Sequence, residues 1–87
     1  MTLISIEKPS MIRLNAADNV LVSTRNVEKG ETTIEGLVTN AKIMRGHKMA
    51  SAAIGDGTPI RKFGQIIGFA KGNIAVGDWV HEHNVIM

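Results

Sequence analysis

The chain has 87 residues, of which 44% are hydrophobic and 3% aromatic, and 10 lysine and arginine residues against 8 acidic ones give a net charge of +2. Such a small, evenly spread charge and so few rings argue against a nucleic-acid-binding protein. The sequence contains no cysteine, which excludes disulfides, thiolate metal sites and thiol nucleophiles.

A glycine-centred pattern recurs along the chain: an apolar residue, two further residues, glycine, two residues and usually another apolar one. It predicts a tight turn with glycine at the position that needs a positive φ, followed at once by a strand. The four copies are "VEKGETT" (27–33), "IMRGHKM" (43–49), "IGDGTPI" (54–60) and "IAVGDWV" (74–80).

Short alternating or apolar runs between these turns predict strands over 19–26, 33–39, 48–54, 61–70 and 79–87. The run "MASAAI" within the third of them is also compatible with a single helical turn. We therefore expect one all-β domain of many short strands, with at most one or two helical turns. No run reaches the roughly 18 apolar residues of a membrane span, and the start "MTLISIEKPS" is not a signal peptide, so we expect no membrane association and a cytoplasmic location.

Two histidines lie one residue apart in "WVHEHNV". If this segment is a strand, alternation places His81 and His83 on the same face, where both rings can converge on one divalent metal. The alternative is a solvent-exposed terminal strand whose histidines bind nothing. The spacing alone leaves both interpretations open.

Charged and imidazole side chains near two other turns are further candidates. His47 and Lys48 follow the turn at Gly46, where an imidazole can act as a base or ligand and an ammonium can bind a carboxylate, although a plain surface turn gives the same pattern. Arg61 and Lys62 are adjacent in a predicted strand, so only one can face a site. Arg61 is the better candidate because guanidinium binds carboxylate in a bidentate manner.

The segment "NAADNV" favours a turn that leads into the first long strand. The side chains of Asp18 and Asn19 can close such a turn through hydrogen bonds to neighbouring backbone groups.

Taken in order, "IRLNAADNVLV", "RGHKMA", "PIRKFGQIIGFA" and "GDWVHEHN" resemble the SAF domain of the altronate and galactarate dehydratase family. The resemblance covers about residues 11–84, so we expect a single SAF domain over 1–87 with 1–10 as a lead-in. It implies a β-clip fold of short, strongly bent strands. In that family the domain is either an N-terminal domain or a separate small subunit.

The resemblance implies a lyase that removes water from a sugar acid, with a divalent metal, commonly iron, with manganese as the alternative. It makes His81 and His83 the expected metal ligands. His47 and Lys48 become the expected proton-transfer residues, and the expected substrate-binding residues are Arg61, Asn15 and Asp18. The chain is too short to hold the catalytic portion, so the expected partners are a large dehydratase subunit and a small anionic sugar acid, and a homo-oligomer is possible.

Two positions depart from the family pattern. Asn15 stands where a histidine is common, and an amide is neither a general base nor a good metal ligand. Phe63 stands where a tyrosine is common. The alternatives are therefore the small subunit of a sulfolactate sulfo-lyase, a non-catalytic SAF module that binds carbohydrate or a partner, and an inactive part of a longer enzyme.

Overall fold

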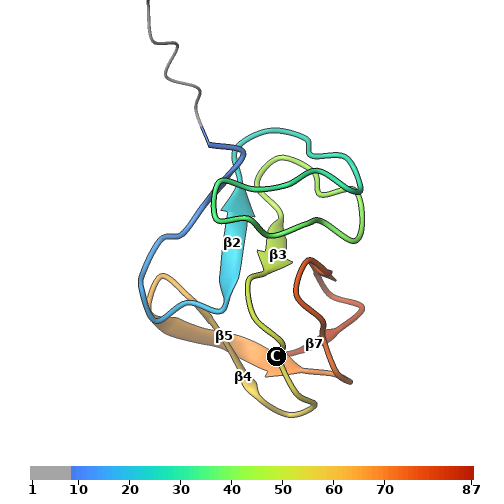
Figure 1. Cartoon of the computed structure of the whole chain (residues 1–87). Coiled ribbons are helices and arrows are strands. Elements are labelled where there is room, and N and C mark those ends of the chain that lie inside the picture. Colours follow the sequence, from blue (N-terminus) through green and yellow to red (C-terminus); the bar gives the residue numbers. More distant parts are fainter. Residues whose placement is uncertain (1–8) are drawn as a thin grey trace, which may run out of the picture.

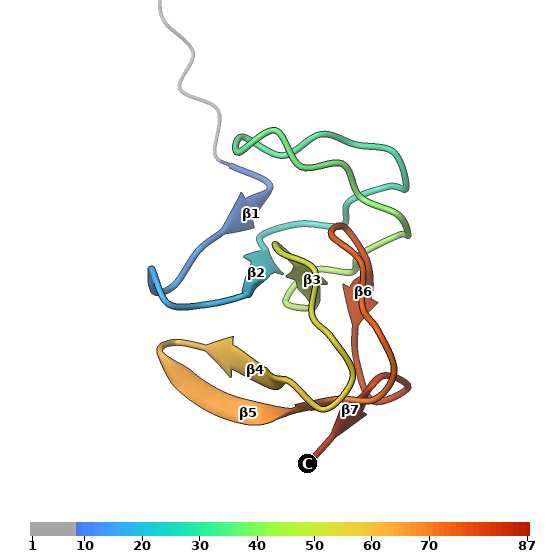
Figure 2. The ribbon, with the colours of Figure 1, turned by 60° about the horizontal axis from the view of Figure 1, so that its bottom comes forward.

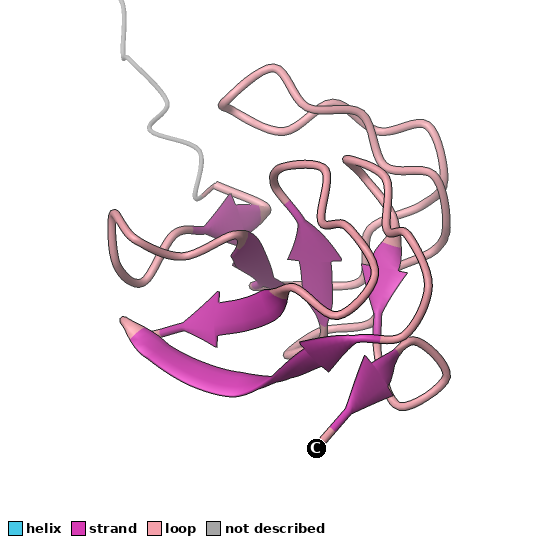
Figure 3. Ribbon diagram, turned by 90° about the horizontal axis from the view of Figure 1, so that it is seen from below, coloured by secondary structure: helices cyan, strands magenta, loops and turns pink. Residues whose placement is uncertain are grey.

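The protein is all-β over residues 9–87, the part that a computed structural model describes. Residues 1–8, most of the predicted lead-in, lie outside it. Within 9–87 there is no helix, and hence none that could cross a membrane (Figure 3). The strands are β1 (Met11–Ile12), β2 (Val20–Ser23), β3 (Lys48–Ala50), β4 (Pro59–Lys62), β5 (Gln65–Ala70), β6 (Trp79–Val80) and β7 (Val85–Ile86).

The strands form two antiparallel sheets, with the orders β1-β2-β3-β6 and β4-β5-β7. Figures 1 and 2 show the first sheet between the long excursion that joins β2 to β3 on one side and the second sheet on the other. The expected β-clip of short, bent strands is confirmed.

The four glycine turns form as predicted. Each glycine has a positive φ: 91° at Gly30, 82° at Gly46, 76° at Gly57 and 89° at Gly77. The apolar residues that open the pattern pair with one another across the fold, as the isolated bridges Val27↔Ile43 and Ile54↔Ile74. All four are buried. The repeat therefore supplies both the turns and part of the core.

The first sheet separates two hydrophobic clusters because its strands alternate. Leu21 faces Met49 in the register of β2 and β3, and both belong to the cluster beneath the excursion. Val20 faces Ala50, and both belong to the cluster shared with the second sheet. Side chains that alternate along β2 and β3 thus fill both faces of this sheet.

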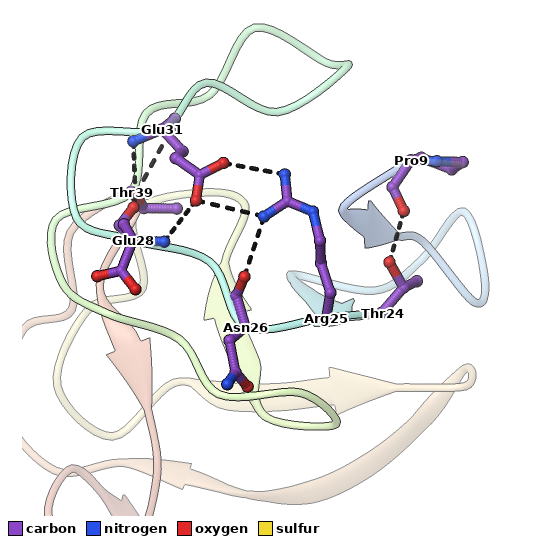
Figure 4. Close-up of polar contacts among 7 residues, drawn as sticks. All are labelled: Pro9, Thr24, Arg25, Asn26, Glu28, Glu31 and Thr39. Atoms are coloured by element: carbon purple, nitrogen blue, oxygen red, sulfur yellow. Dashed lines mark hydrogen bonds and ion pairs between the residues drawn. The ribbon is translucent and has the colours of Figure 1, made fainter. Parts of the chain in front are cut away.

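The excursion between β2 and β3 is held by a polar network rather than by strands (Figure 4). The carboxylate of Glu31 accepts hydrogen bonds from the Arg25 guanidinium and from the Glu28 N–H, and the Thr39 hydroxyl donates to the Glu28 carbonyl. The bond from Arg25, followed by the one from Glu28, lowers the pKa of Glu31. The predicted strand over 33–39 is wrong, because only an isolated bridge forms there and a turn follows it.

The segment 61–70 is a hairpin, not the single strand that its composition predicts. β4 ends at Lys62 and β5 begins at Gln65, and Phe63 and Gly64 form the turn between them with φ of 59° and 75°. Two successive positive φ values are typical of the turns that join antiparallel strands. The hairpin brings Lys62 to the end of a strand next to the first sheet.

Candidate functional site

A tight turn interrupts the C-terminal segment, so the prediction of one strand over 79–87 is wrong. Asn84 makes this turn: its side-chain oxygen accepts the His81 N–H at 2.9 Å, and its side-chain amide donates to the Trp79 carbonyl at 3.0 Å. Asparagine favours turns because its side chain bonds to nearby backbone groups. Strand alternation therefore does not place His81 and His83 on one face.

The imidazoles gather around Trp79 instead. The His81 ring is stacked on His47 and on Trp79, with centroids 4.9 Å away in both cases. The rings of His47 and Trp79 are 5.9 Å apart and nearly parallel, and the Trp79 Nε1–H donates to His47 Nδ1 at 3.2 Å. His83 lies tilted against Trp79 at 5.0 Å. The structure thus brings His81 to the glycine-histidine-lysine turn.

A pocket of about 350 Å³ opens beside this ring cluster. It draws its lining from both sheets and from the turn after β6. Its polar side chains are Lys48, Lys62, His81 and Glu82. Its apolar side chains are Ile67, Val85 and Met87. The combination of a few polar groups with an aliphatic wall is typical of small-molecule sites.

The two lysines give the pocket its positive charge. Burial, and then the neighbouring charge of Lys62, lower the pKa of Lys48. Neither ammonium makes a hydrogen bond or ion pair with another side chain of residues 9–87, where the ion pairs are Arg13 with Glu35, Arg25 with Glu31, and Lys42 with Glu28. Two neighbouring ammonium groups without a carboxylate partner favour the binding of an anion.

Replacing Lys62 by methionine is expected to raise the pKa of Lys48 toward its ordinary value of 10.5, because the substitution removes a nearby positive charge. The rise stays incomplete, since burial is the larger cause of the shift. Titration of the Lys48 side-chain carbon next to the ammonium, followed by NMR, measures it. Lys71→Met, at an exposed position outside the pocket, is the control. An unchanged or lower Lys48 pKa in Lys62→Met contradicts the expectation.

The same shift sets a pH dependence of stability. Between the lowered pKa of Lys48 in the fold and 10.5, the unfolded chain binds this proton and the folded chain does not. Lys48 therefore makes the free energy of unfolding rise with pH across that window, and below it the penalty for the buried charge is fully present. Lys48→Met lacks this rise.

Of the adjacent pair, Lys62 lines the pocket and Arg61 does not. The backbone N–H of Arg61 donates to the side-chain oxygen of Asn19 at 2.8 Å, which ties β4 to the start of β2. The preference for guanidinium over ammonium was a chemical argument, whereas the end of the hairpin decides which residue faces the pocket. The predicted role of Arg61 in substrate binding stays a prediction.

Asp18 and Asn15 lie at the β4–β5 turn, outside the pocket lining. The Asp18 carboxylate, 5% exposed as a residue, accepts the N–H groups of Phe63 and Gly64, both at 2.8 Å. The Asn15 side chain lies against Gly64, where an added Cβ would come within 2.9 Å of its nitrogen. These contacts give both residues a place in holding the turn, and their predicted contact with substrate remains a prediction.

His81 and His83 do not by themselves fit a metal site. An imidazole binds a metal in the plane of its ring, and the His81 ring is within 10° of parallel to His47 and displaced from it. Residues 9–87 contain no group of three or more side chains of metal-binding type. The divalent metal, iron or manganese, thus stays a prediction that requires ligands from outside the described residues.

Three residues of this region were not singled out by the sequence patterns. Trp79 reads as a core residue, and it does pack against one of the clusters. Glu82 reads as the outward residue of a strand, and Lys62 as a solvated charge. The available signal was Asn84, which favours a turn in "HEHN" and would have placed the residues around it differently.

The fold and the pocket together define a small all-β domain of the β-clip type with a cationic pocket between its two sheets. A sequence profile of the altronate/galactarate dehydratase SAF domain matches residues 9–87, and the chain belongs to this family. The family predicted from the four motifs is confirmed.

Curated relatives match over the same region. The chain is 38% identical over 78 residues to an altronate dehydratase of Bacillus subtilis (strain 168), covering 86% of this chain and 16% of the relative. It is 36% identical to an altronate dehydratase of Escherichia coli (strain K12) over 84% of this chain and 15% of the relative. A galactarate dehydratase (L-threo-forming) of Escherichia coli (strain K12) is 31% identical over 87% and 15%. The chain thus spans about a sixth of the length of these relatives.

Proposed function

We propose that this chain is the SAF component of a lyase that eliminates water from a sugar acid such as altronate, and that its pocket binds the carboxylate end of the substrate. The observation that carries the proposal is the pair of unpartnered ammonium groups, Lys48 and Lys62, beside His81 and Glu82 in one pocket. The identities of 38% and 36% to altronate dehydratases support this substrate class.

The chemistry of the elimination gives the pocket residues their roles. A proton leaves the carbon next to the carboxylate, and the hydroxyl of the neighbouring carbon departs as water, so an enediolate-like dianion develops between the two events. Lys48 and Lys62 stabilise that charge. Because its pKa is lowered, Lys48 exchanges a proton more readily near neutral pH than an ordinary lysine. Glu82 and His81 accept or donate hydrogen bonds to the hydroxyls.

The rest of the site comes from a larger catalytic portion in this proposal. The matched region makes up 15% to 16% of the curated dehydratases, which leaves most of each of them outside it. We propose that such a portion covers the open side of the pocket as a large subunit or as another part of the same protein, and that the enzyme works in the cytoplasm.

A second candidate is a SAF module that binds sugar acids without catalysis. Asn15 favours it, because this amide replaces a histidine that is common in the family and lies at the hairpin turn outside the pocket. Both candidates predict carboxylate binding by the lysines. They differ in whether the domain supports turnover.

The binding experiment titrates the ¹⁵N-labelled chain with altronate, galactarate and the uncharged polyol altritol. We expect amide shifts around Lys48, Lys62 and His81 with the two acids and not with altritol. Lys62→Met should weaken binding by about tenfold, the effect of losing one charge-assisted contact worth about 1.4 kcal/mol. Lys71→Met serves as the matched control. Equal shifts with altritol, or equal affinity in Lys62→Met, would contradict the proposal.

A second measurement separates the two candidates. The chain is added to the Bacillus subtilis altronate dehydratase from which the matched region has been removed. Restored elimination of water from altronate supports the enzymatic role. Binding without restored turnover supports the non-catalytic module.

A further inference from the structure

Trp79 has a specific chemical relation to His47 that its place against the core does not require. The indole N–H points at His47 Nδ1 at 3.2 Å, with the two rings within 17° of parallel. His81 lies over both rings, within 13° of parallel to each. Trp79 and His47 therefore form a hydrogen-bonded platform on which the His81 ring rests.

The hydrogen bond fixes the form of the His47 ring. An indole nitrogen is a donor only, so the Nδ1 atom that faces it must be an acceptor and carry no hydrogen. In a neutral imidazole one nitrogen carries the hydrogen and the other accepts, so the hydrogen of His47 is on Nε2. The partner of one ring nitrogen thus determines what the other nitrogen offers.

We propose that Trp79 is a positioning residue that locks His47 as an Nε2–H hydrogen-bond donor and leaves His81 as the imidazole that exchanges protons in the pocket. His81 lines the pocket, and its side chain makes no hydrogen bond with residues 9–87. His47 is outside the pocket lining and has its Nδ1 occupied by the indole. The proton-transfer part rests on the proposed function, whereas the tautomer of His47 does not.

The tautomer is read directly from the ¹⁵N shifts of the imidazole nitrogens, in the chain without ligand and at a pH where histidines are neutral. In the native protein we expect the Nε2–H form of His47, with an unprotonated Nδ1. Trp79→Phe keeps a ring to stack on and removes the donor. The ratio of the Nε2–H form to the Nδ1–H form should fall about tenfold, which corresponds to a hydrogen bond of about 1.4 kcal/mol.

Two further variants keep the test decisive. His83→Ala removes the other ring beside Trp79 and should leave the His47 tautomer unchanged. His47→Ala removes the acceptor, so the indole hydrogen of Trp79 should exchange with solvent faster even if Trp79→Phe does not fold. An Nδ1–H form of His47 in the native protein, or an unchanged ratio in a folded Trp79→Phe, would overturn the inference.

The proton-transfer part has its own readout. In the reconstituted dehydratase, His81→Gln should abolish the dependence of kcat on a group titrating near neutral pH, whereas His47→Gln should lower kcat and keep that dependence. The reverse result would assign proton exchange to His47. Failure of sugar-acid binding would leave the tautomer result intact, so the two proposals fail separately.

Discussion

Replacing Gly77 by alanine is expected to destabilise the fold by about 3 kcal/mol or more, since overpacking and a forced positive φ add. An added Cβ would come within 2.1 Å of the Val38 carbonyl oxygen, and the backbone there has a φ of +89°. Gly77 also joins separate parts of the chain: its N–H donates to the Ala50 carbonyl, and its carbonyl accepts the Asn40 N–H. Thermal unfolding measures the loss, at about 4 to 8 °C for each kcal/mol in a domain of this size.

Gly57→Ala is the matched control because it changes the same kind of turn without the contact. Gly57 has a φ of +76°, and nothing lies within 4 Å of its added Cβ. Only the backbone penalty of about 1 kcal/mol applies there. Equal losses in the two variants would mean that the approach of Val38 to Gly77 contributes nothing.

Asp18→Ala is expected to destabilise the fold by about 3 kcal/mol, because it removes two charge-assisted hydrogen bonds to backbone groups. The donors are the N–H groups of Phe63 and Gly64 in the hairpin turn. Phe63 is held there with a φ of 59°, which a bulky side chain rarely adopts. Loss of the carboxylate therefore frees a strained turn, and chemical denaturation of the purified chain measures the result.

Asp56→Ala provides the comparison for Asp18. Asp56 is exposed and accepts a single backbone hydrogen bond, from the Gly72 N–H at 2.8 Å, so its loss is expected to cost about 1 kcal/mol or less. If Asp18→Ala instead keeps native stability and loses affinity for a sugar acid, the carboxylate contacts substrate and the structural role assigned to it is wrong.

The turns and much of the core could be predicted because both depend on local pattern. Glycine at a positive φ and an apolar residue three positions earlier form one signal, and the four copies of it appear in the structure as turns and buried bridges. The family could also be predicted, since four motifs in a fixed order are far more specific than any one of them. Neither prediction requires knowledge of which strands pair.

The hairpin at 61–70 could not be predicted from composition, because phenylalanine occupies a position where asparagine or glycine is usual. The turn at 81–84 was hidden by an apparent alternation of side chains, and the Asn84 side chain decides the outcome. Each turn changes which residue reaches the pocket. The charges and rings of the site were therefore recognisable one by one, whereas their grouping depends on tertiary structure.

The shortness of the strands at the sheet edges limits how this domain can associate with other chains. β1 and β6 border one sheet and β7 borders the other, with two residues each, and the remaining edge strand, β4, begins with a proline and ends with a lysine. Such edges offer few free backbone groups in a row, and proline and lysine further oppose strand addition. The domain is thus protected against edge-to-edge aggregation, and any stable complex it forms must be built from side-chain contacts.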